Sequence, residues 1–144
     1  MAAKIAILLV VFLGSAGFWF YKWRQENPVQ QAVLTADAKA YTNNLALSGV
    51  EMKAAEAFAG QQVVEILGKI TNKGQRPIGV VEVTCVFYDA YGQIILRQRT
   101  PIVRSRDGGL KPGETKLFRM PFDELPESWN QALPSLVIAN IQFD

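Results

Sequence analysis

The sequence predicts a mainly β protein, an antiparallel β-sandwich preceded by one N-terminal transmembrane α-helix. Residues 5–21 contain no charged side chain, which is typical of a membrane-spanning segment. From residue 45 onward, apolar and polar residues alternate in six or seven short runs separated by Gly, Pro and Asn. The runs show no βαβ rhythm, so a parallel sheet is not expected. The predicted domains are an anchor over residues 1–24, a stalk or short helix over 25–44, and a β-sandwich over 45–144.

The apolar N-terminal segment has the length that a membrane span needs. At about 1.5 Å per residue, residues 5–21 and their flanks cross a hydrocarbon core of roughly 30 Å. Because lipid offers the backbone no hydrogen-bond partners, we expect a helix. A cleaved signal peptide is the alternative, since Gly14-Ser15-Ala16 resembles a cleavage site. The apolar run continues through Phe18 to Tyr21 beyond these small residues, which favours a retained anchor.

Five residues of this segment are candidates for contacts with lipid or with a neighbouring helix. Trp19, Tyr21 and Trp23 are expected at the membrane interface, with ring bodies in lipid and polar edges among headgroups. Gly14 and Gly17 lie three residues apart, hence on about one helix face, and would let a neighbouring backbone approach closely. The alternative is that both glycines only reflect a signal-peptide-like composition. Positive charges flanking the segment are nearly balanced, but a short N-terminal tail favours a signal anchor that exports the sandwich.

The region after the anchor changes its apolar period from helical to two. Val29, Val33 and Ala36 recur at roughly helical spacing, which predicts a short helix or a partly extended stalk over residues 25–44. Such a weakly apolar segment would gain stability by lying against a partner. From residue 45 the period is two, and a slip in the alternation at Gly49 predicts a β-bulge.

The remaining strands are predicted from alternation and from the turn residues between them. They are expected over residues 63–70, 79–88, 93–99, 115–122 and 136–143, with turns at 89–92 and 111–114. The segment 79–88 has the strongest pattern, and one face of it should carry Val81, Val83, Cys85 and Phe87. In the last strand, Leu136 and Ile138 are expected on one face. The opposite face should carry Val137, Ala139, Ile141 and Phe143.

Several turn and strand-end residues resemble a known family. The motifs are a Gly-x-Ile-x-Asn strand end, an aromatic-Tyr-Asp-x-x-Gly hairpin and a Leu-x-Pro-Gly-Glu turn before a Phe-bearing strand. They are carried by Gly68, Ile70 and Asn72; by Phe87, Tyr88, Asp89 and Gly92; and by Leu110, Pro112, Gly113, Glu114 and Phe118. Together they are similar to FxLYD-type and related immunoglobulin-like domains of bacterial membrane-anchored proteins, over roughly residues 45–143. Pro126, Trp129 and Asn130 also resemble one branch of these proteins.

The resemblance implies an immunoglobulin-like fold and a non-enzymatic module. It places the chain in the bacterial inner membrane as a single-pass protein, and the anchor orientation then puts the sandwich in the periplasm. These motifs consist of turn and core residues, so they specify a fold rather than a reactive site.

Composition excludes several classes of chemistry. The chain has no histidine, which removes histidine-based acid–base catalysis and the commonest zinc and haem ligand. Its one cysteine, Cys85, lies in an apolar strand pattern and is expected to be a small core residue. A net charge of +2 is too small to indicate nucleic-acid binding. We therefore expect no catalytic residue, no cofactor and no metal, and neither nucleic acid nor a small-molecule substrate as a ligand.

Two surface features are candidates for contact with a partner. The segment 97–119 is rich in cations, with candidate contacts at Arg97, Arg99, Arg104, Arg106 and Lys111. They could bind anionic lipid headgroups or an acidic partner. Alternatively, they could be a solvated edge strand and loop whose charges prevent edge-to-edge pairing. Trp129 could anchor its loop to the sandwich or present an aromatic ring to a partner.

These observations favour a membrane-anchored interaction module, an accessory or scaffolding subunit of a larger integral-membrane complex such as a photosynthetic or respiratory one. Its expected partners are subunits of that complex and the lipid bilayer. The alternative is an envelope ligand- or client-binding protein or chaperone, which could pair a sandwich edge with its client. An open edge or an apolar groove in the sandwich would favour the alternative.

Overall fold

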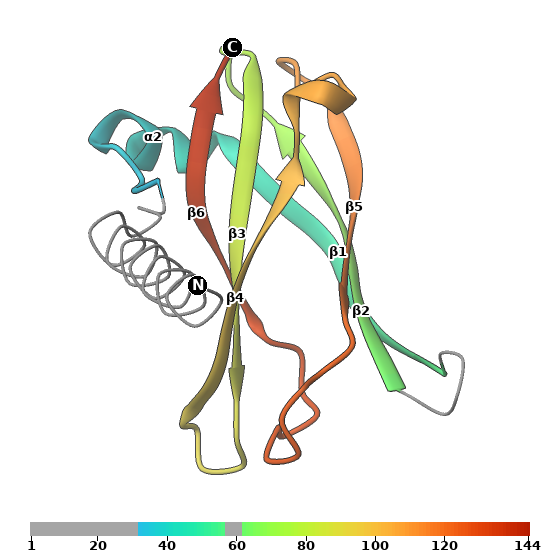
Figure 1. The fold of residues 1–144 in the computed structure, drawn as a ribbon. Helices are drawn as coiled ribbons and strands as arrows, with labels where there is room; N and C mark the ends of the chain where they lie inside the picture. The colour runs from blue at the N-terminus through green and yellow to red at the C-terminus, as the bar shows by residue number, and fades with distance from the viewer. Residues whose placement is uncertain (1–31, 57–61) are drawn as a thin grey trace, which may run out of the picture. The chain divides into compact units, whose positions relative to one another are not determined.

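The computed structural model describes residues 32–56 and 62–144 (Figure 1). Its contacts separate the chain after Ala32, and all elements below belong to the compact unit Val33–Asp144. In the described ranges no helix is both long and apolar enough to cross a membrane. The predicted anchor lies outside these ranges, as do its five candidate residues, Gly14, Gly17, Trp19, Tyr21 and Trp23.

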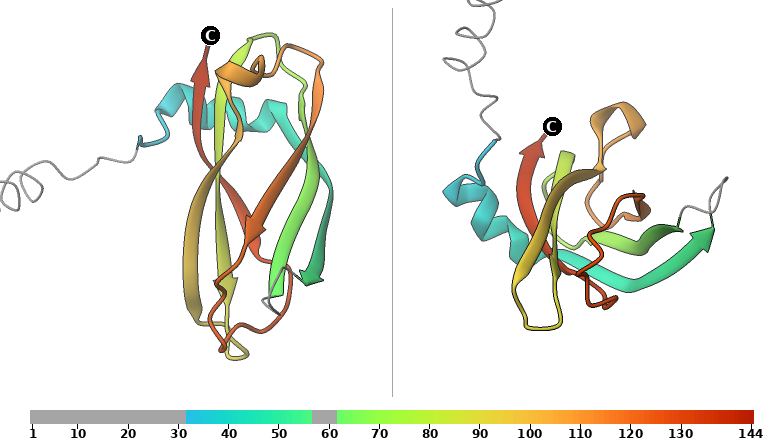
Figure 2. Two further views of the ribbon diagram at one scale, coloured as in Figure 1. Left: turned by 45° about the vertical axis from the view of Figure 1, so that its right-hand side comes forward. Right: turned by 60° about the horizontal axis from the view of Figure 1, so that its bottom comes forward.

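Two antiparallel sheets, each of three described strands, pack face to face as a β-sandwich (Figures 1 and 2). Sheet 1 has the order β1-β2-β5, formed by Leu45–Glu56, Gln62–Asn72 and Thr115–Phe122. Sheet 2 has the order β4-β3-β6, formed by Ile94–Val103, Ile78–Tyr88 and Ser135–Phe143. The predicted mainly β, antiparallel architecture is confirmed.

The core lies between the sheets and is built by the predicted inner face of β3. Val81, Val83, Cys85 and Phe87 are all fully buried. The Cys85 sulfur lies 3.7 Å from the sulfur of Met120 on β5, so the two sheets are in direct contact there. Side chains alternate in and out of this core along each central strand, as the period of two requires.

The predicted bulge in β1 is confirmed. The register of β1 against β2 shifts between Ser48 and Glu51, and Gly49 has a φ of 57°. Glycine suits this position because a side chain disfavours the left-handed region. The bulge keeps Leu47 and Met52 on the core face, since they pair with Ile70 and Ile66 of β2.

A second bulge makes our assignment of faces in β6 wrong. Glu82 pairs with Asn140 whereas Val83 pairs with Ile138, so Ala139 is an extra residue in β6. The extra residue reverses the alternation. Ile141 and Phe143 therefore join Leu136 and Ile138 in packing against the core, rather than facing away from them.

The strand-end motif Gly68-x-Ile70-x-Asn72 has a structural explanation. Gly68 lies beneath the Phe118 ring, where an added Cβ would stand 2.5 Å from the Cζ atom. The Asn72 side chain is fully buried, yet its polar atoms are hydrogen-bonded. Its side chain accepts from the Gly74 N–H (3.1 Å) and donates to the carbonyl oxygen of Arg76 (2.8 Å). Asn72 therefore shapes the turn between β2 and β3.

The segment before β1 is hydrogen-bonded to Asn72 at the β2–β3 turn. Thr35 caps helix α2 (Ala36–Tyr41), which is followed by the 3-10 helix η1 (Thr42–Asn44). The Tyr41 hydroxyl donates to Asn72 Oδ1 at 2.8 Å, and the Tyr41 ring packs edge-on against Phe143 with a centroid separation of 5.1 Å. Within the segment expected to be a stalk, α2 thus lies against the sandwich (Figure 1).

Candidate partner-binding site

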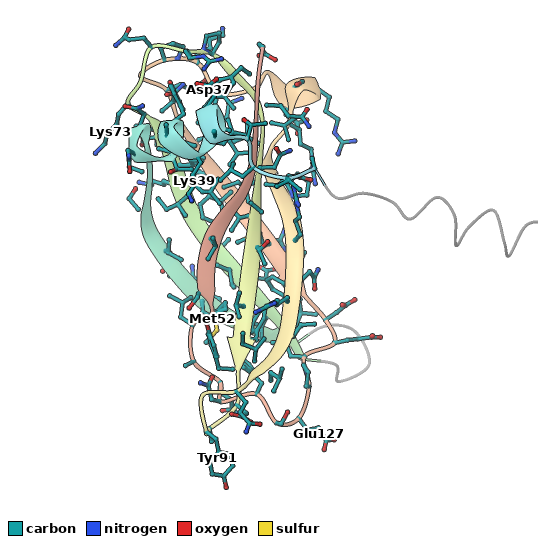
Figure 3. All side chains as sticks on the ribbon, turned by 90° about the vertical axis from the view of Figure 1, so that its left-hand side faces the viewer. Asp37, Lys39, Met52, Lys73, Tyr91 and Glu127 are labelled. Carbon is teal, nitrogen blue, oxygen red and sulfur yellow. The ribbon has the colours of Figure 1, made fainter. Side chains whose placement is uncertain are left out.

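The two ends of the sandwich differ in charge. One end, here called the α2 end, carries α2, the β2–β3 turn and the β4–β5 connection, whereas the hairpin end carries the β3–β4 turn and the β5–β6 loop (Figure 1). Figure 3 shows Asp37, Lys39 and Lys73 at the α2 end, and Tyr91 and Glu127 at the hairpin end. The charged residues of segments 88–93 and 123–134 are all acidic: Asp89, Asp123, Glu124 and Glu127. The two loops of the hairpin end are therefore purely acidic, whereas the α2 end carries charges of both signs.

The predicted basic stretch is divided between two surfaces. Arg97 and Arg99 lie on β4, an edge strand of sheet 2, and Arg99 forms a 2.6 Å ion pair with Glu82 of β3. The Asn140 side chain also donates to the Glu82 carboxylate, at 3.1 Å. The other three candidates are exposed in the β4–β5 connection at the α2 end: Arg104, Arg106 and Lys111. These three side chains and Arg97 have the exposure that contact with an anionic surface requires, whereas Arg99 is partly buried.

Trp129 is half-buried in the β5–β6 loop, where it contacts the core. Its ring lies edge-on to Phe87, with a centroid separation of 6.0 Å. Its indole N–H donates to the Ala132 carbonyl at 3.2 Å, and the next residue, Asn130, donates its backbone N–H to Tyr88 at 2.9 Å. Trp129 therefore fastens its loop to the sandwich, while part of the side chain stays accessible.

A pocket of about 470 Å³ opens beside Trp129 at the hairpin end. Its walls come from β1, from β2 and from the β5–β6 loop. The apolar lining consists of Met52, Ala54, Val64, Leu125, Pro126 and Trp129, and the polar lining of Asp123, Glu127 and Gln131. Both carboxylate residues are exposed to solvent. The site therefore combines an apolar wall with negative charge at its rim.

The loop that forms one wall is held by its own hydrogen bonds. The Trp129 backbone N–H donates to the Pro126 carbonyl at 3.0 Å, and the Ala132 backbone N–H donates to Asn130 Oδ1 at 3.0 Å. Gln131 lies between these bonds with a φ of 60°, a conformation that few non-glycine residues adopt. Such strain persists where surrounding contacts determine the backbone. The wall is thus preorganised rather than loose.

A metal centre or a reactive thiol would give the described residues bond-making chemistry. Within residues 32–56 and 62–144, no group of three His, Cys, Asp or Glu side chains is placed to hold a metal ion. Burial raises the pKa of the Cys85 thiol to about 11, so this thiol is protonated at neutral pH. The hairpin-end pocket can contribute apolar contact through Trp129 and electrostatic attraction through Asp123 and Glu127.

Sequence reasoning missed most of this pocket because its walls come from segments far apart in the chain. Met52 and Val64 lie on the neighbouring strands β1 and β2. Leu125 and Gln131 belong to the β5–β6 loop, about sixty residues after Val64 in the chain. Only Trp129 and its loop gave a signal in the sequence. No protein-family model, curated protein or solved structure matches the chain.

Proposed function

We propose that this chain is a non-catalytic, single-pass membrane-anchored interaction module that serves as an accessory or scaffolding subunit of a larger integral-membrane complex. The observation that carries the proposal is the difference between the two ends of the sandwich. The α2 end carries the exposed cations Arg104, Arg106 and Lys111 beside the acids Asp37, Asp107 and Glu114, and receives the chain from residue 33. The hairpin end instead presents an apolar pocket whose charged lining residues are both carboxylates. One end is thus suited to a membrane surface and the other to a protein partner.

The α2 end fits an anionic membrane surface. Arg104, Arg106 and Lys111 are exposed there, and each cation near an anionic leaflet contributes about 1 kcal/mol. The chain enters this end through α2, which is fixed to the sandwich because Ala38 and Tyr41 are buried. A membrane anchor within residues 1–31 would therefore be joined to the sandwich through α2.

We assign the sandwich to the FxLYD-type and related immunoglobulin-like domains, in the bacterial inner membrane with the domain in the periplasm. The roles of Gly68 beneath Phe118 and of Asn72 in the β2–β3 turn support this assignment. The turn glycines Gly92 and Gly113 support it as well, since both have a φ of 77°. These positions are turn and core residues, which specify a fold rather than a binding site.

Gentle solubilisation of native membranes, followed by size-exclusion chromatography and mass spectrometry, tests the proposed function. We expect the chain to elute with integral-membrane subunits at a fixed stoichiometry. An unrelated single-pass protein of similar abundance is the control and should elute apart from them. Recovery of the native chain only as a free monomer would contradict the proposal.

A second candidate function is favoured by the pocket itself. An envelope ligand- or client-binding protein would need an apolar groove, and the pocket beside Trp129 offers one. The two functions differ in how the partner is held. A client-binding protein exchanges many different segments at low occupancy, whereas an accessory subunit keeps one partner in a constant ratio. The same chromatography distinguishes them.

A further inference from the structure

The hairpin end combines exposed apolar side chains with unpaired negative charge. Tyr91 at the β3–β4 turn is 90% exposed, and Leu133 in the β5–β6 loop is 46% exposed. Large apolar side chains exposed together at one end of a domain are typical of contact surfaces. Leu133 belongs to the β5–β6 loop that lines the pocket, and Tyr91 lies in the β3–β4 turn at the same end of the sandwich (Figure 3).

The charge at this end is not neutralised from within the described part of the chain. Neither Asp123 nor Glu127 forms an ion pair with a described residue. The cations on the nearby strands of sheet 1 are engaged with other acids, Lys53 with Glu51 and Arg119 with Glu65. A cation brought by a partner would therefore meet two carboxylates that have no competing partner in the described ranges.

We propose that the hairpin end is the docking surface for a cationic, apolar segment of a partner protein. In this arrangement a large apolar side chain of the partner fills the pocket against Met52 and Trp129, and an adjacent Lys or Arg lies between Asp123 and Glu127. The inference rests on the proposed function, in that the occupant belongs to another protein. A volume of about 470 Å³ is within the range of pockets that bind compact ligands.

Charge complementarity selects this occupant over others. An acidic segment would be repelled by the two rim carboxylates, which have no cation between them. A purely apolar occupant such as an acyl chain would cover carboxylates without pairing them, which costs free energy. A second copy of this chain could offer the cations of its α2 end, so self-association is an outcome that the test must distinguish.

The test measures binding of two fluorescein-labelled peptides to the full chain in lipid nanodiscs. The first peptide is Arg-Leu-Trp-Leu-Arg-Gly and the second is Glu-Leu-Trp-Leu-Glu-Gly. We expect fluorescence anisotropy to detect binding of the first peptide only. Its affinity should fall several-fold when the salt concentration rises from 0.05 to 0.5 M, values chosen to shorten the screening length from about 14 to about 4 Å. Equal binding of both peptides, or binding of neither, would overturn the proposal.

Matched variants locate the site on the molecule. Glu127→Gln removes a pocket carboxylate and should weaken the first peptide about threefold, as expected for a partly exposed ion pair. Glu124→Gln removes an equal charge from the same loop outside the pocket, and should change affinity little. Ala54→Arg places a cation in the pocket and should abolish binding, whereas Ser48→Arg on the same strand should not. If Glu127→Gln and Glu124→Gln weaken peptide binding equally, or if Ala54→Arg and Ser48→Arg do, the peptide does not bind in this pocket.

Co-purification separates failure of the docking site from failure of the proposed function. A chain that recovers its membrane partner but binds neither peptide would retain the proposed function and lose this docking surface. A chain that binds the cationic peptide yet co-purifies with no membrane protein would retain the docking surface and contradict the proposed function. Concentration-dependent elution as a dimer, lost in Glu127→Gln, would identify a second copy as the occupant and overturn the assignment to another protein.

Discussion

Removal of the Tyr41 hydroxyl should destabilise the sandwich by about 2 kcal/mol, although Tyr41 precedes the first strand. The hydroxyl donates to Asn72 Oδ1 at 2.8 Å and accepts from the Arg76 N–H at 3.1 Å. Each such bond contributes about 1 kcal/mol net. Tyr41→Phe keeps the ring against Phe143, so no cavity forms. Asn72 Oδ1 keeps the Gly74 N–H as a donor, so no further penalty for an unsatisfied oxygen is added.

Urea unfolding of the full chain in mild detergent, followed by near-ultraviolet circular dichroism, measures this change. A loss of about 2 kcal/mol lowers the folding equilibrium constant roughly thirtyfold and should shift the midpoint without changing the slope. Tyr91→Phe is the control, because Tyr91 is 90% exposed and its hydroxyl makes no such network. If Tyr41→Phe and Tyr91→Phe unfold within about 0.5 kcal/mol of each other, α2 is not bound to the sandwich as described.

Three further changes test the core, the thiol and the anchor. Gly68→Ala should cost about 1–3 kcal/mol in urea unfolding, because the new Cβ would stand 2.5 Å from the Phe118 ring. Since burial raises the pKa of Cys85 from 9.0 to about 11, the unfolded thiol loses its proton first. The free energy of unfolding should therefore be fully retained below about pH 9 and fall by roughly 2–3 kcal/mol toward pH 11, a loss absent from Cys85→Ala. Gly14→Leu combined with Gly17→Leu should still insert into membranes but weaken assembly with integral-membrane subunits.

Each of these expectations has a contradicting result. Unchanged stability of Gly68→Ala would mean that Phe118 does not cover that position. A Cys85→Ala chain that loses the same stability between pH 9 and 11 would assign the loss to other groups. Full recovery of the double leucine variant in its complex would leave the soluble domain as the main docking surface.

The strands were predictable because each has local causes. Alternation along β3 follows from burial of one face, and Gly49 and Gly92 mark a bulge and a turn that need positive φ. The error in β6 has a physical reason. The extra residue, Ala139, is apolar and continues the alternation, and the adjacent Asn140 was not interpreted as a break, so an unbroken pattern was expected there. The register against β3 decides the faces, and register is a tertiary property.

The candidate site was predictable only in part, because it depends on contacts distant in sequence. The Trp129 loop stood out in the sequence, but Met52 and Val64 had no signal beyond membership of a strand. The link between Tyr41 and Asn72 likewise joins residues 31 positions apart. Neither local propensity nor spacing encodes such pairs, since each depends on how the two sheets pack.

Site-specific photocrosslinking in native membranes tests most directly whether the hairpin end contacts a partner. Benzoylphenylalanine would replace Leu133 at the hairpin end or Lys69 on the outer face of sheet 1, both exposed positions. We expect the Leu133 position to crosslink to one integral-membrane subunit and the Lys69 position to give no such product. Crosslinks of equal yield from both positions, or none from Leu133, would contradict the proposed role of the hairpin end.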